Sequence, residues 1–124
     1  MGYRELTGYT VKITGEGTAS GRLAVTEDHE NRGGILHGGA IATLCDSAMG
    51  RAVRTKVDTD MRTATATMTV NYLASAHPGD VVCVEASVIK AGRTTIVVEA
   101  EVCRESDGKP IARAVATFIQ SSRR

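Results

Sequence analysis

Aromatic side chains are scarce in this chain of 124 residues, which holds 3% aromatic residues and no tryptophan. A core with so few rings must be built from aliphatic side chains, methionine and alanine. Neither sign of charge dominates, because 15 basic and 14 acidic residues leave a formal net charge of +1. No run of lysine or arginine forms a patch, so the composition gives no reason to expect a nucleic acid or an anionic membrane as a partner.

Long apolar runs and cysteine motifs are also missing. No apolar run approaches the roughly 20 residues that span a bilayer, and the first residues lead into no signal core. The cysteines Cys45, Cys83 and Cys103 are widely separated and show neither metal-ligand spacing nor a disulfide framework. We therefore expect three reduced core cysteines in a cytoplasmic protein, without a metal or redox cofactor.

Alternating apolar and polar residues predict five to six strands in a single domain over residues 1–124. Residues 1–8 are polar and are expected to form a loose lead-in. The predicted strands cover residues 9–13, 21–25, 62–73, 81–89, 94–103 and 111–119. Turn residues join the last three strands directly, so we expect an antiparallel meander after the strand 62–73.

Residues 38–53 predict one long helix. Apolar residues cover almost its whole circumference, which is typical of a buried helix. A narrow seam interrupts them, with members three or four residues apart: Gly39, Thr43, Asp46, Ser47 and Gly50. The sequence therefore predicts an α+β fold in which a curved antiparallel sheet wraps one buried helix.

A histidine between two glycine pairs leads into this helix. The amides of a helix's first turn have no carbonyl four residues earlier, so they are free donors with partial positive charge. Gly38 and Gly39 carry no side chain, which lets a ligand oxygen come close to these amides. We expect the chemistry at this point of the chain.

The spacing of several residues resembles that of a known family. The residues that carry the resemblance are Asn31, His37-Gly38-Gly39, Asp46, Asn71-Tyr72-Leu73, Gly92-Arg93 and the final strand from Ala114 to Phe118. Together they look like the hotdog-fold acyl-CoA thioesterases of the phenylacetate-pathway (PaaI-like) type. The resemblance covers nearly the whole chain and implies a thioester hydrolase for which coenzyme A is part of the substrate.

The resemblance also implies roles for single residues. Asp46 matches the family's general base or nucleophile toward the thioester carbonyl, and the amide of Gly38 matches the group that polarises the carbonyl oxygen. Asn31 and His37 match positions that orient the substrate or water. Each has a structural alternative as well, because Asp46 could bond a neighbouring hydroxyl, Asn31 could hold a turn and His37 could simply precede a helix.

The strand 62–73 supplies a further candidate. The resemblance places at Thr65 a hydroxyl that assists the water, and Thr63 and Thr67 share its predicted face and remain alternatives. The family's proline after the Tyr-Leu pair is absent, because Ala74 stands there. The shape of the acyl pocket is therefore left open.

Three residues are candidates for substrate binding. Gly39 lies beside the proposed carbonyl site, and Lys90 and Arg93 could contact the phosphates of coenzyme A. Exposed basic residues at strand ends are, however, usually only solvated. These assignments stay expectations.

Helix geometry predicts a site between subunits. Asp46 lies eight residues beyond Gly38, which corresponds to about 12 Å along the axis. The two residues cannot meet one thioester from a single helix. We therefore expect at least a homodimer with two helices side by side and antiparallel, and the resemblance favours a dimer of dimers, that is, a homotetramer.

The sequence does not select the acyl group. Small side chains on the strand 62–73 are compatible with aryl or medium-chain acyl groups. Two alternatives to a thioesterase stay open, an acyl-thioester hydratase or dehydratase and a non-catalytic acyl-CoA-binding protein.

Overall fold

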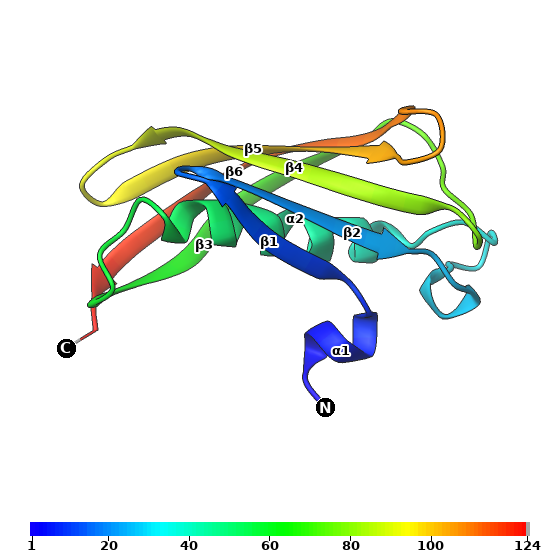
Figure 1. The fold of residues 1–124 in the computed structure, drawn as a ribbon, viewed down its shortest axis with the longest axis horizontal. Coiled ribbons are helices and arrows are strands. Elements are labelled where there is room, and N and C mark those ends of the chain that lie inside the picture. Colours follow the sequence, from blue (N-terminus) through cyan, green and yellow to red (C-terminus); the bar gives the residue numbers. More distant parts are fainter. Residues whose placement is uncertain (124) are drawn as a thin grey trace.

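The computed structural model describes residues 1–123 as one antiparallel sheet packed on one long helix (Figure 1). The strands are β1 Thr10–Gly15, β2 Thr18–Ala24, β3 Met61–Tyr72, β4 Val81–Ala91, β5 Thr95–Arg104 and β6 Pro110–Ser122. The helices are α1 Tyr3–Thr7, the 3-10 turn η1 Glu27–His29 and α2 Gly38–Arg54. The predicted α+β architecture, a curved sheet against one helix, is confirmed.

The six strands lie in the order β1-β2-β4-β5-β6-β3 across the sheet. The predicted meander is confirmed for β4, β5 and β6. β3 does not lie beside β4, which follows it in the chain, but at the sheet edge, where it pairs with β6. Within residues 1–123 no strand covers the other edge of β3. Local periodicity does not encode this placement, because it depends on where the connection after β3 crosses.

α2 packs against the sheet through one face. The residues of this face are buried: Ile41, Leu44, Cys45, Ala48, Met49, Ala52 and Val53. The residues of the seam are half-buried or exposed. The prediction that α2 is buried on all sides is therefore wrong for the single chain. The pattern misled because Ala40 and Ala42 count as apolar yet cover little area. No helix of the described chain is long and apolar enough to cross a membrane.

A β-bulge interrupts β3. Thr65 pairs with Phe118 and Thr67 pairs with Thr117, which leaves Ala66 as an extra residue in the register. An extra residue reverses the alternation of side chains between the two faces. Thr65 shares the inner face with Phe118, whereas Thr67 points to the outer face. The prediction of two uninterrupted faces from residue 62 to 73 is therefore wrong.

Residues 1–8, expected as a loose lead-in, contain α1. The hydroxyl of Tyr3 lies 2.8 Å from Thr43 Oγ1 on α2. His29 accepts a hydrogen bond from the Thr26 amide at Nδ1, so its Nε2 donates to the Thr7 carbonyl at 2.6 Å. These contacts join the segment to residues far away in the chain, which local sequence does not reveal.

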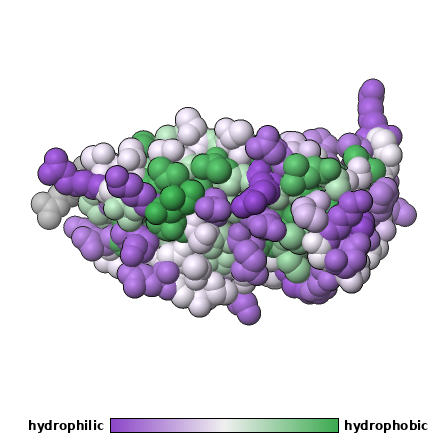
Figure 2. All heavy atoms as spheres, turned by 90° about the horizontal axis from the view of Figure 1, so that it is seen from above, coloured by the Kyte–Doolittle hydropathy of each residue, from purple (hydrophilic) through white to green (hydrophobic). Residues whose placement is uncertain are grey.

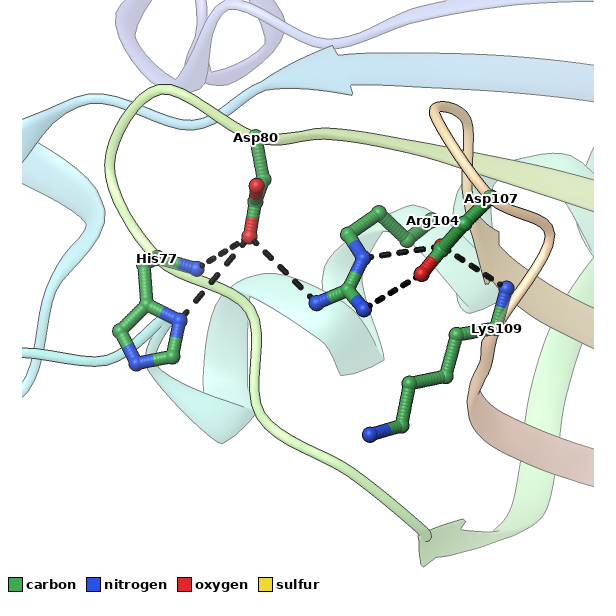
Figure 3. Close-up of polar contacts among 5 residues, drawn as sticks. All are labelled: His77, Asp80, Arg104, Asp107 and Lys109. Carbon is green, nitrogen blue, oxygen red and sulfur yellow. Dashed lines mark hydrogen bonds and ion pairs between the residues drawn. The ribbon is translucent and has the colours of Figure 1, made fainter.

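Five residues form a polar clasp between the turn at 77–80 and the turn that joins β5 to β6 (Figure 3): His77, Asp80, Arg104, Asp107 and Lys109. Asp80 accepts from the His77 amide at 2.9 Å and lies 4.0 Å from Arg104. Arg104 donates twice to Asp107, at 3.0 and 2.7 Å. Next to this turn, the Ala76 carbonyl accepts from the Leu36 amide at 2.8 Å, which fixes the loop that enters α2.

The three cysteines are free but differ in position. Cys45 is a core residue, as predicted. Cys83 and Cys103 alternate with the buried Val84 and Val102, so their side chains lie on the sheet face away from α2 and are half-buried. Their assignment to the core is wrong, because a strand within an apolar segment still has an outer face.

Candidate active site

Asp46 lies in the middle of α2, on the seam that the sheet leaves open. The hydroxyl of Thr65 donates to its Oδ1 at 2.6 Å. Among residues 1–123, Oδ2 has no hydrogen-bond partner and no basic side chain lies within ion-pair distance of the carboxylate. Asp46 is also half-buried, and a carboxylate in that position has unused capacity to accept a proton or a hydrogen bond.

The bulge of β3 decides which threonine reaches this carboxylate. The sequence left Thr63, Thr65 and Thr67 as candidates on one face. The structure brings Thr65 to Asp46, while the bulge turns Thr67 to the opposite face. Thr63 shares the inner face with Thr65 but lies two residues nearer the start of β3, where it pairs with Gln120.

A hollow of about 530 Å³ opens beside Asp46. Its walls come from α2, from β1 and β6, and from the N-terminal segment: Gly2, Tyr3, Arg4, Glu5, Tyr9, Val11, Asp46, Ser47, Gly50, Arg51, Arg54 and Phe118. Sequence reasoning missed the N-terminal wall. Tyr3 meets Thr43 across 40 positions of the chain, and no local pattern signals such a contact.

His37 caps the start of α2. Its Nδ1 accepts a hydrogen bond from the Gly39 amide at 2.8 Å. An amide can only donate, so Nδ1 carries no proton and the ring proton of neutral His37 is on Nε2. The amides of Ala40 and Ile41 donate to the His37 carbonyl at 2.9 and 3.3 Å. Of the first-turn amides, that of Gly38 has no acceptor within the described residues and is free for a ligand.

Tyr72 holds the same turn from the side of β3. Its hydroxyl donates to the Gly38 carbonyl at 2.8 Å. A Cβ atom on Gly38 would lie 3.2 Å from the Tyr72 ring, so a residue larger than glycine would crowd it. Burial raises the pKa of Tyr72, which keeps its hydroxyl protonated as the donor.

Asn31 lies on the wall of a second hollow, of about 330 Å³, together with Gly38 and Tyr72. Its Oδ1 accepts from the amides of Gly33 and Ile35 at 2.8 and 3.3 Å. Asn31 therefore has the structural role that the sequence allowed as an alternative, because its side chain stabilises its own turn. Its Nδ2 group is the part of the side chain that a ligand could use.

The predicted site residues thus fall into two groups within one chain. Asn31, His37 and Gly38 gather at the start of α2, and Asp46 and Thr65 meet at its middle. Asp46 and Gly38 line different hollows. The separation of about 12 Å expected from eight helical residues remains in the fold.

The residues expected to bind substrate are not brought together. The Gly39 amide is already used by His37. Lys90 and Arg93 are exposed at the turn between β4 and β5, at the end of the sheet away from the start of α2 (Figure 1). A single chain therefore does not join these two positions to one ligand.

The thiol of Cys45, next to Asp46 in the chain, is not placed to act as a nucleophile. Burial, and then the charge of Asp46, raise the pKa of Cys45 to about 12, so this thiol stays protonated. Among residues 1–123 no group of three or more His, Cys, Asp or Glu side chains is placed to hold a metal ion. Asp46, which accepts a hydrogen bond from Thr65, lines the hollow of about 530 Å³.

The sequence profile of a family described as "Thioesterase superfamily" matches residues 33–111, which include Asp46 and Thr65. Human acyl-coenzyme A thioesterase 13 is 30% identical over 106 residues, which cover 82% of this chain and 75% of the human protein. A Caenorhabditis elegans protein described as a candidate esterase is 40% identical over 96 residues, which cover 77% of this chain and 56% of the worm protein.

The fold has counterparts among solved structures. A conserved protein from Pseudomonas aeruginosa superposes with a TM-score of 0.89 at 38% identity, over 98% of this chain and 94% of the other. The arrangement of one helix and six strands is therefore shared along nearly the whole length of both chains.

Proposed function

This chain belongs to the thioesterase superfamily of thioester hydrolases, and we propose that it hydrolyses acyl-coenzyme A to a free acid and coenzyme A. The observation that carries the proposal is the Asp46–Thr65 pair, whose carboxylate has a free oxygen beside a hollow of about 530 Å³. A volume of this order suits a small acyl group. The acyl groups that we propose are aryl or medium-chain.

Asp46 would act in one of two ways. As a general base, it takes a proton from water while the water oxygen bonds to the thioester carbonyl carbon. The tetrahedral intermediate then breaks its carbon–sulfur bond, and coenzyme A leaves as a thiol with the proton from Asp46. As a nucleophile, Asp46 attacks the carbonyl carbon and expels coenzyme A as a thiolate, which leaves an acyl–Asp46 anhydride. Water then hydrolyses the anhydride to the free acid and the Asp46 carboxylate, and the proton that water gives up converts the thiolate to the thiol. Thr65 donates to Oδ1 in both routes and leaves Oδ2 to react.

The free amide of Gly38 would stabilise the carbonyl oxygen. Negative charge develops on this oxygen in either route, and an oxyanion donor of this kind contributes about 3–4 kcal/mol to lowering the barrier. His37 and Tyr72 fix the turn that carries the amide. Asn31 would orient substrate or water through its Nδ2 group, because its Oδ1 is occupied.

We propose that each site forms between two subunits. Gly38 and Asp46 lie too far apart on one helix to share a carbonyl, so the amide would come from one chain and the carboxylate from its partner. The open seam of α2 and the uncovered edge of β3 support this arrangement. A dimer is the minimum, and a dimer of dimers remains our expectation.

Coenzyme A is proposed as part of the substrate, and no metal or redox cofactor is proposed. Lys90 and Arg93 remain candidates for its phosphates, reached from a partner's site. The free thiols of all three cysteines suit the reducing cytoplasm in which we propose that the protein works.

The first experiment measures thiol release from a panel of aryl and aliphatic acyl-coenzyme A thioesters. The wild type is compared with Asp46→Asn, a nearly isosteric variant, at matched folding and oligomeric state. Turnover by the wild type that falls by roughly a hundredfold or more in Asp46→Asn supports the proposal, and the panel identifies the acyl class. Binding without thiol release would instead favour a non-catalytic acyl-coenzyme A-binding protein, and hydration of an enoyl thioester would favour a hydratase.

A second experiment tests the subunit arrangement. Asp46→Asn and Asn31→Ala chains are unfolded, mixed in equal amounts and refolded. If each site takes Asp46 from one chain and Asn31 from the other, half of the dimers regain one intact site, which restores about a quarter of the wild-type activity. Sites built within single chains would give no restoration beyond the sum of the two variants.

A further inference from the structure

Cys83 and Cys103 occupy opposite positions on neighbouring strands, on the outer side of the sheet. They are paired residues of β4 and β5, and both side chains are half-buried and free. We infer that these two cysteines form a reversible disulfide across the sheet when a small-molecule disulfide, such as oxidised glutathione, is present. This inference does not depend on the proposed thioesterase activity.

The spacing of the two strands permits the bond. The Glu105 amide donates to the Val81 carbonyl at 2.8 Å, which marks Val81 and Glu105 as a hydrogen-bonded pair. Such pairs recur every second residue, so Cys83 and Cys103 are also a hydrogen-bonded pair, with Cα atoms about 5.5 Å apart. Disulfides form between Cα atoms roughly 4.4–6.8 Å apart.

A reagent can reach the pair. Cys83 lies on the wall of a hollow of about 320 Å³ on the outer face, together with Lys12, Arg22 and Glu85. Figure 2 looks onto this side of the molecule, where hydrophilic residues separate two hydrophobic groups. Cys45 offers no such access, because it is fully buried behind the sheet.

The thiols now point to carboxylates and not to each other. Cys83 Sγ lies 3.7 Å from Glu105 Oε1, and Cys103 Sγ lies 3.4 Å from Glu101 Oε1. A side-chain rotation at each cysteine would bring the sulfurs together. Burial, with these carboxylates, raises the pKa of both thiols, so the exchange is slow and the thiols persist when no disulfide is supplied.

The reaction proceeds in two balanced steps. The thiolate of Cys83 attacks a sulfur of the small disulfide, forms a mixed disulfide and releases one small thiolate. The thiolate of Cys103 then attacks Cys83 Sγ, forms the protein disulfide and releases the second small thiolate. The two protons of the cysteines end on the two small thiols, and the protein is oxidised by two electrons.

The bond would be easy to reduce again. A hydrogen-bonded strand pair keeps its side chains further apart than the neighbouring non-hydrogen-bonded pairs, so a disulfide there is strained. Strained or exposed disulfides have higher reduction potentials and are labile. Labile disulfides of this kind are the ones that report the thiol–disulfide balance inside cells.

The test treats the folded protein with excess oxidised glutathione, stops the exchange with acid and measures the intact mass. We expect the wild type to lose two hydrogen atoms, and a tryptic peptide map to join the Cys83 and Cys103 peptides. Cys103→Ser should stop at a glutathione adduct on Cys83, because no second thiol resolves it. Reduction with dithiothreitol should restore the starting mass of both proteins.

Three results would overturn the inference. One is a wild type that keeps glutathione on Cys83 without a crosslink. Another is a folded protein that stays reduced under conditions in which the urea-unfolded chain reacts. The third is a disulfide that maps to Cys45 or joins two chains. Equal thermal stability of the wild type and Cys103→Ser before oxidation confirms that the variant is folded.

Discussion

Asp46 and Asp107 are both carboxylates on the surface of one chain, but the fold treats them oppositely. Asp107 accepts two hydrogen bonds from Arg104 and one from the Lys109 amide. Asp46 accepts one, from Thr65. Arg104 and the Lys109 amide lower the pKa of Asp107 to about 2, so its charge is fully engaged in holding the clasp.

The number of hydrogen bonds that a carboxylate accepts distinguishes a structural carboxylate from a candidate functional one in this fold. A carboxylate whose two oxygens both accept hydrogen bonds from the fold stabilises a turn and is already engaged there. A carboxylate that has one oxygen without a hydrogen bond, on an apolar helix beside a hollow, does not stabilise a turn and can still bind a ligand. Removing the two groups should therefore have opposite effects on activity and stability.

The largest effects are expected when the charge of Asp46 or of Asp107 is removed. Asp46→Asn should lower kcat/KM by roughly a hundredfold or more with little change in Tm, because it removes the proposed base or nucleophile. Asp107→Asn should leave kcat/KM unchanged and lower Tm. Thiol release and thermal melting of both variants check this, and similar activity losses in the two would contradict it.

The contact of Thr65 with Asp46 gives the next effect. Thr65→Val keeps the shape but removes the donor to Oδ1, and we expect kcat to fall by about tenfold. Thr67→Val is the matched control, because the bulge places Thr67 on the opposite face of the sheet. Equal activity of the two variants would show that the hydrogen bond to Asp46 does not contribute to the reaction.

Asp107 can also be deprived of its basic partner, so that, like Asp46, it has no ion pair. Arg104→Gln removes its charged partner, and we expect a small decrease in the urea midpoint with unchanged kcat, because the clasp lies in exposed turns. Chemical denaturation and thiol release measure the two quantities. A large loss of activity would show instead that the clasp positions the loop before α2 through Ala76 and Leu36.

The smallest effect concerns acid stability. The pKa of Asp107 is about 2 in the folded protein against an ordinary value of 3.8. Its ion pair therefore stabilises the fold fully above pH 3.8 and loses this effect as the pH falls toward 2. Carboxyl NMR titration should show a midpoint near 2 for the wild type and a higher one in Arg104→Gln. A normal wild-type midpoint would contradict the engagement of Asp107 by Arg104 and the Lys109 amide.

Local patterns predicted the secondary-structure elements well. Helical periodicity set the bounds of α2 almost to the residue, and alternation found the strands. Asp46 stood out because a charged residue on an apolar helix needs a reason. These signals depend on neighbours within a few positions of the chain.

Features that depend on distant contacts were not predicted. The bulge at Ala66 follows from the register between β3 and β6, and the N-terminal wall of the hollow follows from the contact of Tyr3 with Thr43. The outer position of Cys83 required knowing which face of β4 the helix covers. Each is decided by tertiary packing, which overrides local preference.

The bulge of β3 has a consequence for comparing relatives of this chain. Before Ala66 the inward positions have odd numbers, and after it they have even numbers. An alignment that treats β3 as one regular block would pair inward residues of one protein with outward residues of another whenever the bulge is missing or shifted. Insertions and deletions of a single residue should therefore be tolerated at Ala66 more readily than elsewhere in the strand, as long as Thr65 keeps its place opposite Phe118.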